Sequence, residues 1–242
     1  MPRAEPGPSY GIDAPGVVRN LSGASLVLIV CGGFAALAHG SAASFAPALL
    51  WTGLAPGAMA LWMIASSLWF KQRTVAKLLA AHAWRGDEAV LDVGCGRGLL
   101  SVCAARMVPK GSVVAIDLWR SEDLSKNGPE AIRANLRAAH VADRVRVETG
   151  DARALPFPEG SFDIVGSMTV VHNIADRSGR EAAIAEMWRV LKPGGQLLIF
   201  DITHTRSYAR QLRLAGAEQV LLSWPIFLWG MVGWRMTATK PE

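Results

Sequence analysis

The sequence Ala-Val-Leu-Asp-Val-Gly-Cys-Gly-Arg-Gly at residues 89–98 decides the fold. Its apolar first half, 89–93, predicts a buried strand, and the apolar residues 99–107 that follow predict a helix. Gly94, Gly96 and Gly98 favour a tight turn between them, at which the backbone can approach a ligand closely. A strand, a glycine-rich turn and a helix in this order are typical of the unit that opens a nucleotide-binding α/β domain.

Strands and helices alternate along the rest of the chain, which predicts a mostly parallel sheet. We expect strands at 89–93, 112–116, 145–148, 162–167 and 196–202, and helices at 99–107, 129–140 and 180–191. A helix at 207–215 and two closing strands at 218–224 and 234–239 complete the pattern. Ligands of open α/β sheets bind beyond the carboxyl ends of the strands. The polar residues at such ends are Asp92, Asp117, Asp151, Ser167 and Asp201.

An acidic residue, Asp92, lies just before the turn, and the glycines have the spacing G-x-G-x-G. A carboxylate in this place repels phosphate and attracts an ammonium group. In these residues the chain resembles the class I S-adenosylmethionine-dependent methyltransferases, over about 73–240. The resemblance implies a Rossmann-like, seven-stranded α/β fold, mostly parallel with an antiparallel last strand. It also implies S-adenosylmethionine as the cofactor and S-adenosylhomocysteine as the product, and it leaves the methyl acceptor open.

The resemblance assigns cofactor contacts to residues at the ends of the strands. Asp117 would accept hydrogen bonds from the ribose diol, and Asp92 would attract the α-ammonium group. Asp151 would accept a hydrogen bond from the adenine amino group, although it also suits a helix N-cap. Leu118 and Trp119 could stack on adenine, while ordinary packing equally explains Trp119. The remaining cofactor residues implied are Gly94, Cys95, Gly96, Ala152 and Ser167.

The stretch 167–174 lies where the acceptor chemistry usually sits in this fold. Its His172 is the candidate general base, because an imidazole titrates near neutral pH and can remove a proton from an amine, thiol or hydroxyl. A structural place beside the cofactor is the alternative. Asp201 with His204 is a second candidate pair.

The N-terminal residues 1–20 favour either a tail or a lid over the cofactor site. In a lid, Tyr10 and Asp13 would contribute to catalysis by attracting a sulfonium or an acceptor. The three cysteines of the chain have no metal-ligand spacing, so we predict no metal site.

Residues 21–70 contain no Asp, Glu, Lys or Arg. Two apolar segments, 21–43 and 48–70, are each long enough at about 1.5 Å per residue to cross a hydrocarbon core of about 30 Å. We therefore predict a transmembrane hairpin, with a buried hairpin docked on the domain, or a partner-binding surface, as the alternatives. Basic residues flank its outer ends, which places both ends and the domain on the cytoplasmic side of the cell (inner) membrane.

The chain thus divides into an N-terminal segment at 1–20, two transmembrane helices within 21–70 and a methyltransferase domain at 71–242. We expect an enzyme that transfers a methyl group by SN2 displacement to a small or lipid-soluble acceptor through an N, S or O nucleophile. A membrane sensor that binds S-adenosylmethionine without catalysis, and a protein methyltransferase, are the alternatives. The net charge of +5 fits an anionic membrane surface.

Two questions of contact stay open at this stage. The apolar stretch 225–233 would dip into the membrane, pack on the two helices or wall the acceptor pocket. The helical hairpin could mediate a homodimer. The sequence has no basic cluster interleaved with aromatic residues, so we do not expect a nucleic-acid partner.

Overall fold

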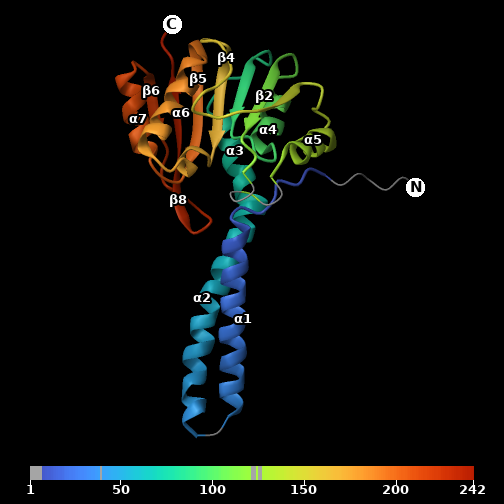
Figure 1. Ribbon diagram of the computed structural model, residues 1–242, viewed down its shortest axis with the longest axis vertical. Helices are drawn as coiled ribbons and strands as arrows, with labels where there is room; N and C mark the ends of the chain where they lie inside the picture. The colour runs from blue at the N-terminus through green and yellow to red at the C-terminus, as the bar shows by residue number, and fades with distance from the viewer. Residues whose placement is uncertain (1–6, 39, 121–123, 125–126) are drawn as a thin grey trace, which may run out of the picture.

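The computed structural model describes residues 7–38, 40–120, 124 and 127–242. An α/β domain carries two long helices, α1 (Pro15–Leu37) and α2 (Ala46–Ala65), which project from it side by side (Figure 1). A 3₁₀ turn, η1 (Gly40–Phe45), joins them at the end far from the domain. The two apolar segments therefore form a helical hairpin.

The starts of both helices differ from the prediction for the same reason. α1 begins at Pro15 rather than at residue 21, and α2 begins at Ala46 rather than at residue 48, with Pro47 in its first turn. Proline is suited to the first turn of a helix, because the backbone N–H that it lacks has no partner there. The segment before α1 is correspondingly shorter, and its residues 1–6 lie outside the described residues.

α2 continues into the domain without a break. A π-helical turn, η2 (Ser66–Phe70), follows it, and α3 (Lys71–Leu79) continues the same helix. π-turns inside α-helices are rare and occur mostly at functional positions. One continuous helix therefore connects the hairpin with the first element that packs on the sheet.

Small residues let α1 and α2 pack closely. A Cβ added at Gly32 would lie 2.8 Å from Leu50 Cγ, and one added at Gly57 would lie 2.6 Å from Ser25 Oγ. The Ser25 hydroxyl donates a hydrogen bond of 2.8 Å to the carbonyl of Gly53 on α2. Close packing of small residues and hydroxyl bonds to backbone are typical of helices that associate in lipid.

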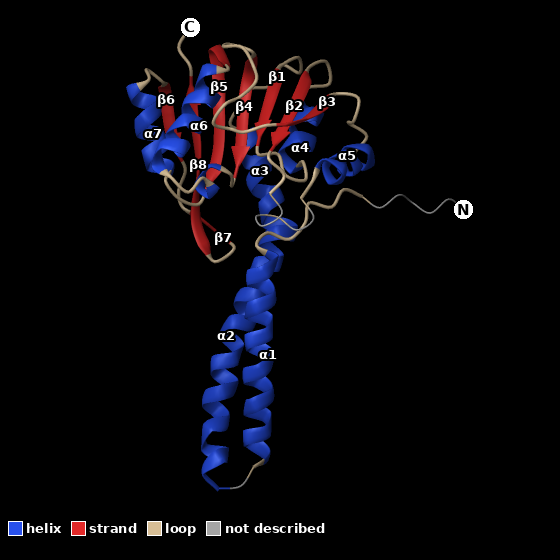
Figure 2. Cartoon of the chain, viewed as in Figure 1, coloured by secondary structure: helices blue, strands red, loops and turns tan. Residues whose placement is uncertain are grey.

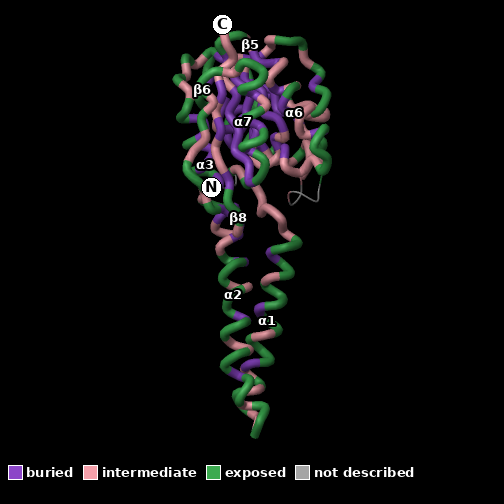
Figure 3. Tube along the Cα trace, turned by 90° about the vertical axis from the view of Figure 1, so that its left-hand side faces the viewer, coloured by how far each residue is buried: buried purple, intermediate pink, exposed green. Residues whose placement is uncertain are grey.

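The outer faces of the hairpin remain uncovered. Only 11% and 17% of the most apolar windows of the two helices are buried, and Figure 3 shows the contrast with the buried core of the domain. The exposed apolar side chains on these helices include Leu26, Phe34, Leu37, Trp51, Leu54 and Leu61. The alternative of a hairpin buried on the domain is therefore wrong for this structure.

The sheet has the strand order β3-β2-β1-β4-β5-β8-β6, with β7 paired to β8 alone. Its strands are β1 (Ala89–Val93), β2 (Ser112–Asp117), β3 (Val145–Thr149), β4 (Phe162–Met168), β5 (Leu191–Asp201), β6 (Glu218–Leu222), β7 (Ile226–Leu228) and β8 (Met231–Thr239). β1 to β5 run parallel, and β8 is antiparallel to β5, β6 and β7. The mixed α/β sheet is confirmed, with β7 as an addition.

Helices cover both faces of the sheet. One buried cluster joins it to α3, α4 (Leu99–Met107) and α5 (Pro129–Ala138), and the other joins it to α6 (Arg177–Arg189) and α7 (Thr205–Leu214). α4 has the predicted bounds, and the other helices differ from the prediction by a few residues at their ends. α6 starts earlier than predicted because the Asp176 carboxylate caps it, accepting a hydrogen bond from Gly179 N.

The apolar stretch 225–233 forms a β-hairpin, which the sequence did not predict. β7 and the first residues of β8 pair across Trp229-Gly230, and both turn residues have positive φ, 51° and 79°. Such two-residue turns match the twist of paired strands. The hairpin hangs below the sheet, beside the top of the helical hairpin (Figure 2). The carboxyl ends of the parallel strands also point toward the helical hairpin (Figure 2).

Candidate active site

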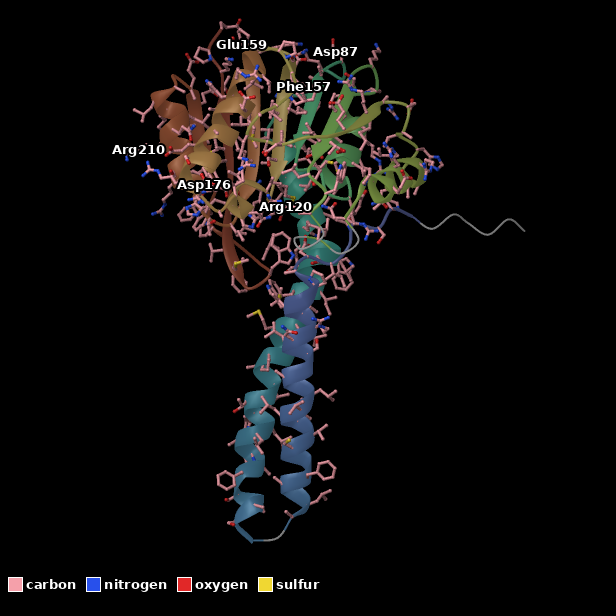
Figure 4. All side chains as sticks on the ribbon, viewed as in Figure 1. Asp87, Arg120, Phe157, Glu159, Asp176 and Arg210 are labelled. Carbon is pink, nitrogen blue, oxygen red and sulfur yellow. The ribbon has the colours of Figure 1, made fainter. Side chains whose placement is uncertain are left out.

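A cavity of about 470 Å³ lies at the carboxyl ends of the parallel strands. This volume falls in the range of roughly 300–1,000 Å³ that is usual for small-molecule sites. Arg120 and Asp176 line it, and Figure 4 shows both at the end of the domain that faces the helical hairpin. Asp87, Phe157 and Glu159 lie at the opposite end (Figure 4). The cavity therefore lies between the sheet and the hairpin.

The glycine turn forms one wall of the cavity. Gly94 has φ of 73° and donates a backbone hydrogen bond of 2.8 Å to Ile116 O, which ties the turn to β2. Gly96 has φ of 50° and donates 2.7 Å to Asp117 Oδ2. Both glycines and Cys95 line the cavity. Positive φ is costly for residues with a Cβ, so the turn requires glycine.

We expect Gly94→Ala to be strongly destabilising. The new Cβ would lie 2.2 Å from Val170 Cγ2, in a backbone conformation with positive φ. We expect the free energy of unfolding to fall by about 2–4 kcal/mol from combined strain and overpacking, measured by chemical denaturation. Gly160→Ala is the matched control, because Gly160 has φ of 63° and a Cβ there would be 4.0 Å from its nearest neighbour. Equal losses in the two variants would contradict the argument from close approach.

Asp117 organises the turn as well as facing the cavity. Its Oδ2 accepts from Gly96 N, and its Oδ1 accepts a hydrogen bond of 2.6 Å from Trp119 N. The carboxylate therefore lies at the end of β2 with a fixed orientation. The second lone pairs of its oxygens can still accept hydrogen bonds from a diol.

Leu118 and Trp119 have different surroundings. Leu118 is 45% exposed and lines the cavity. Trp119 lies outside the cavity lining: its indole N–H donates 2.7 Å to Thr149 Oγ1, and its ring packs against the core. Ser167 also lies outside the lining, because its hydroxyl is buried and donates 2.9 Å to Val93 O. The structure thus brings Leu118 to the cavity and gives Trp119 and Ser167 packing positions.

Asp151 and Ala152 both line the cavity at the end of β3. Arg153 pairs with the Asp151 carboxylate at 2.6 Å, and this hydrogen bond holds the pKa of Asp151 below its usual value. The carboxylate is therefore ionised near neutral pH and can accept from an amino group. It accepts from Arg153 N as well, as a loop cap does.

Asp92 is buried beside the glycine turn and lines the cavity. Burial raises the pKa of Asp92 to about 7; a hydrogen bond from Ser101 opposes the shift, and the nearby charge of Asp117 adds to it. Burial likewise raises the pKa of the Cys95 thiol, so Cys95 is no thiolate nucleophile. An anion with a raised pKa in a small cavity is a natural partner for a cation.

His172 and Asp201 form a hydrogen-bonded pair on the far side of the cavity. His172 lies on the 3₁₀ turn η3 (Val171–Asn173) after β4, and its Nδ1 contacts the carboxylate of Asp201 at the end of β5. The backbone N of His172 also donates to Asp201 Oδ2 at 3.1 Å. Asp201 is fully buried, and Tyr208 Oη donates to it at 3.4 Å. A carboxylate on Nδ1 favours the tautomer in which Nε2 can accept a proton.

The sequence hypothesis paired Asp201 with His204, and this pairing is wrong. His204 is exposed and contacts the ring of Tyr208 at a centroid distance of 6.5 Å, while Asp201 bonds His172. Two strand ends that are distant in sequence meet here through parallel pairing of β4 with β5.

The N-terminal segment 7–14 crosses the cavity and is held at several points. Tyr10 and Asp13 both line the cavity. Asp13 forms an ion pair of 2.8 Å with the buried Lys71, and Lys71 Nζ also donates 3.3 Å to Tyr10 O. Ser9 exchanges two hydrogen bonds with the Asn135 side chain, at 2.8 and 2.9 Å. Burial raises the pKa of Tyr10 to about 12, so its phenol is a hydrogen-bond donor at neutral pH.

Several cavity residues were missed by reasoning from the sequence. Lys71 reads as one of the basic residues after an apolar segment, and Met63 reads as a membrane residue. Nothing in their local sequence shows that they line the cavity. Trp229 belongs to the stretch 225–233, for which a wall of the acceptor pocket was one of three alternatives, and it lines the cavity. Asn127 lies in a polar loop after Asp117, and its buried Oδ1 has no hydrogen-bond partner among the described residues. An unpaired buried acceptor in a cavity wall is a position for a ligand donor.

These residues fit S-adenosylmethionine. Asp92 and Asp117 suit an ammonium group and a ribose diol, Asp151 suits an adenine amino group, and Leu118 offers an apolar surface for the base. Asn127 Oδ1, which has no hydrogen-bond partner in the part of the chain that the structure describes, can accept from a donor of the ligand. The cavity is thus anionic where the cofactor is cationic and apolar where the cofactor is aromatic.

Comparisons with known proteins agree with this geometry. Residues 90–195 match the family model described as "Methyltransferase domain". The chain is 29% identical to the demethylmenaquinone methyltransferase of Symbiobacterium thermophilum over 63% of this chain and 55% of that protein. It is 34% identical to the ubiquinone/menaquinone biosynthesis C-methyltransferase UbiE of Marinomonas sp., over 51% and 46% of the two chains.

A third relative is the 27-O-demethylrifamycin SV methyltransferase of Amycolatopsis mediterranei, 37% identical over 53% of this chain and 44% of that protein. The chain spans about half the length of the curated relatives it matches. The fold resembles the crystal structure of the YcgJ protein of Bacillus subtilis, with a TM-score of 0.58 and 16% identity over 70% of this chain and 99% of the other.

A SAM-dependent methyltransferase of Aquifex aeolicus shares the fold with a TM-score of 0.53 and 19% identity, over 68% of this chain and 88% of the other. S-adenosylmethionine is the cofactor that the family match and the solved structures support. Residues 90–195 thus match a methyltransferase domain in sequence, and the fold is shared with solved S-adenosylmethionine-dependent methyltransferases.

Proposed function

We propose that this chain is a membrane-anchored methyltransferase that acts on a small-molecule acceptor. The observation that carries the proposal is that the carboxylate-flanked glycine turn and His172 line one cavity, and that the buried Asp201 behind His172 contacts its Nδ1. Curated relatives named for menaquinone, ubiquinone and rifamycin methylation support a small molecule as the acceptor. One of these names specifies carbon methylation, so carbon joins N, S and O as the attacking atom.

The residues of this chain would prepare the acceptor. When bound, the cofactor supplies a methyl group on a sulfonium, which an SN2 displacement can transfer. His172 would take the proton that the acceptor loses, through Nε2, because Nδ1 donates to Asp201. The cavity walls would align the acceptor and exclude water, an effect worth up to about 7–11 kcal/mol in favourable intramolecular models.

The segment 7–14 would act as a lid over the cofactor. Its support is the set of contacts that fixes it across the cavity: Ser9 with Asn135, and Asp13 with Lys71. Asp13 then holds the lid rather than reacting, and the Tyr10 phenol would donate a hydrogen bond to a ligand. Opening such a lid requires only that a few polar contacts break.

The helices α1 and α2 would anchor the protein in the membrane. Both are long and apolar enough to span one, and their outer faces are exposed. Basic residues at the domain end support a cytoplasmic position for the domain by the positive-inside rule. We expect the protein to stay in the membrane pellet after carbonate extraction; release into the supernatant would contradict a spanning hairpin. The same faces would carry any homodimer contact.

The function can be tested with methyl-labelled S-adenosylmethionine and purified protein in nanodiscs. Protein is incubated with a membrane lipid extract and, separately, with a pool of soluble amines, thiols and phenols. Label in either small-molecule fraction is the expected result. Label in protein would favour a protein methyltransferase, and cofactor binding without transfer would favour a sensor.

The affinity for the cofactor should depend on pH through Asp92. The folded protein without cofactor keeps Asp92 protonated up to pH about 7, whereas an unfolded carboxyl loses its proton near pH 4. The free energy of unfolding should therefore fall as pH rises between about 4 and 7. A bound ammonium group favours the carboxylate, so affinity should rise by up to about ten-fold per pH unit up to pH 7 and then level off.

Calorimetric titration between pH 5.5 and 8.5, in two buffers of different ionisation enthalpy, measures the affinity and the proton released. Asp92→Asn is the control, because the amide cannot titrate and should flatten the profile. An affinity that is independent of pH in the unchanged protein would contradict the contact between Asp92 and the ammonium group.

A further inference from the structure

The cavity has an apolar end that the cofactor contacts do not use. The carboxylates of Asp92, Asp117 and Asp151 and the glycine turn line the cavity from the strand ends, whereas Met63, Trp229 and Met231 line it from α2 and the β7–β8 hairpin. The Asp13–Lys71 ion pair lies between these two parts, because Asp13 N and the Trp229 indole both donate to Ser67 Oγ. Met63 belongs to α2 and is 4% exposed; Met231 begins β8 and is 46% exposed. The apolar end therefore reaches from the buried face of a long apolar helix to the molecular surface.

Trp229 is held firmly at this end. Its indole N–H donates 3.1 Å to Ser67 Oγ, and its backbone N donates 3.2 Å to Ser66 Oγ. Both serines lie on the π-helical turn and are buried. Trp229 itself is buried with φ of 51°. A hairpin turn, a π-turn and two buried hydroxyls thus fix both the backbone and the ring of Trp229.

The β7–β8 hairpin and α2 touch beside this end. A Cβ at Gly230 would lie 2.9 Å from Met59 Sδ, and the Phe227 and Trp62 rings stack at 5.8 Å. The β7–β8 hairpin also exposes apolar side chains beside α2: Phe227 is 51% exposed and Val232 is 40% exposed. The exposed apolar surface of α2 is therefore continuous with the surface at which the cavity ends.

We propose that the acceptor is an amphiphile with one apolar tail, which enters from the bilayer past Met231. Its reactive head lies near His172, and its tail lies against Met63 and Trp229. The proposal rests on the membrane anchoring and methyl transfer proposed above. A soluble acceptor would not need a cavity wall made by a helix of the hairpin. Trp229 is a specificity residue in this arrangement, because its ring sets the width of the tail site.

A photocross-linking experiment tests the route without requiring activity. p-Benzoylphenylalanine replaces Met231 in the full chain, in nanodiscs made from a membrane lipid extract. Irradiation should attach extract lipids to the peptide that contains position 231. The control places the same group at Arg210, which is exposed on α7 away from the hairpin (Figure 4). No lipid adduct at position 231, or equal adducts at both positions, would overturn the route.

A second experiment narrows the tail site. Met63→Trp should lower methyl transfer to the lipid extract at least ten-fold, with the dissociation constant of S-adenosylmethionine unchanged. Leu61→Trp is the matched control, because Leu61 lies on the same helix and is 69% exposed; its transfer should equal that of the unchanged protein. Full transfer by Met63→Trp would overturn the tail site.

The two experiments separate this proposal from the proposed function. If the unchanged protein binds the cofactor but transfers no label to any fraction, the proposed methyl transfer is wrong. The cross-link at position 231 then still tests whether an amphiphile enters the cavity past Met231. If label appears only in the soluble pool, methyl transfer holds and the amphiphile is excluded.

Discussion

Asp117→Ala is expected to weaken the binding of S-adenosylmethionine by at least about 100-fold, which corresponds to about 2.7 kcal/mol. The variant removes the carboxylate proposed to accept from the ribose diol. It also leaves the backbone N–H groups of Gly96 and Trp119 without their acceptor, and each unsatisfied donor costs about 1–3 kcal/mol where it is buried. Calorimetric titration of the protein in detergent measures the dissociation constant.

The control for this prediction is Asp87→Ala. Asp87 is an acidic residue with a 61% exposed side chain at the opposite end of the domain, so its loss changes net charge equally without touching the cavity (Figure 4). Asp117→Asn should be intermediate, because an amide oxygen can still accept one of the two backbone bonds. Unchanged affinity in Asp117→Ala would refute the assignment of the cofactor to this end of the cavity.

His172→Gln is expected to lower kcat by about 10²–10⁴-fold, the usual contribution of a general base. The dissociation constant of S-adenosylmethionine should change by only a few-fold, because the glycine turn and the three carboxylates stay intact. The rate of methyl transfer from labelled cofactor, followed from pH 5 to 9, measures both the loss and its pH dependence.

Two further variants distinguish catalysis from packing. Asp201→Asn should lower kcat by less than His172→Gln does, because Asp201 positions the imidazole and does not line the cavity. His204→Gln should leave kcat unchanged, since His204 is exposed and Asp201 bonds the other histidine. A full rate in His172→Gln would leave His172 only a structural place beside the cofactor.

The sheet could be predicted from the sequence because its signals are local. Apolar runs ending in Asp92 and Asp117 mark buried parallel strands, and parallel strands bring their carboxyl ends to one edge without further information. The glycines between β1 and α4 are required by positive φ, so the turn was also readable. The start of α1 was missed because Pro15 suits a helix start, yet was grouped with the Pro- and Gly-rich tail.

The acceptor side could not be predicted, because it is built from residues far apart in sequence. Met63 is one apolar residue among many in α2, and Trp229 lies in a stretch whose apolar character fits a membrane, packing on the helices or a pocket wall equally well. Only the packing of β7 and β8 on the π-turn shows that both line one cavity. His172 was identified from its type and place, whereas its partner required the pairing of β4 with β5.

The uninterrupted helix from α2 through the π-turn to α3 fixes the rotation of the domain relative to the helical hairpin. Each residue added to such a helix turns everything beyond it by about 100° and lifts it by about 1.5 Å. If the helical hairpin spans a bilayer, one alanine inserted before Ser66 would rotate the cavity opening by about a quarter turn around the helix axis. Seven inserted residues make nearly two full turns, so the cavity opening would face its original direction but lie about 10 Å farther from the bilayer. The number of residues in this helix therefore sets both the direction in which the cavity opens and its distance from the hairpin.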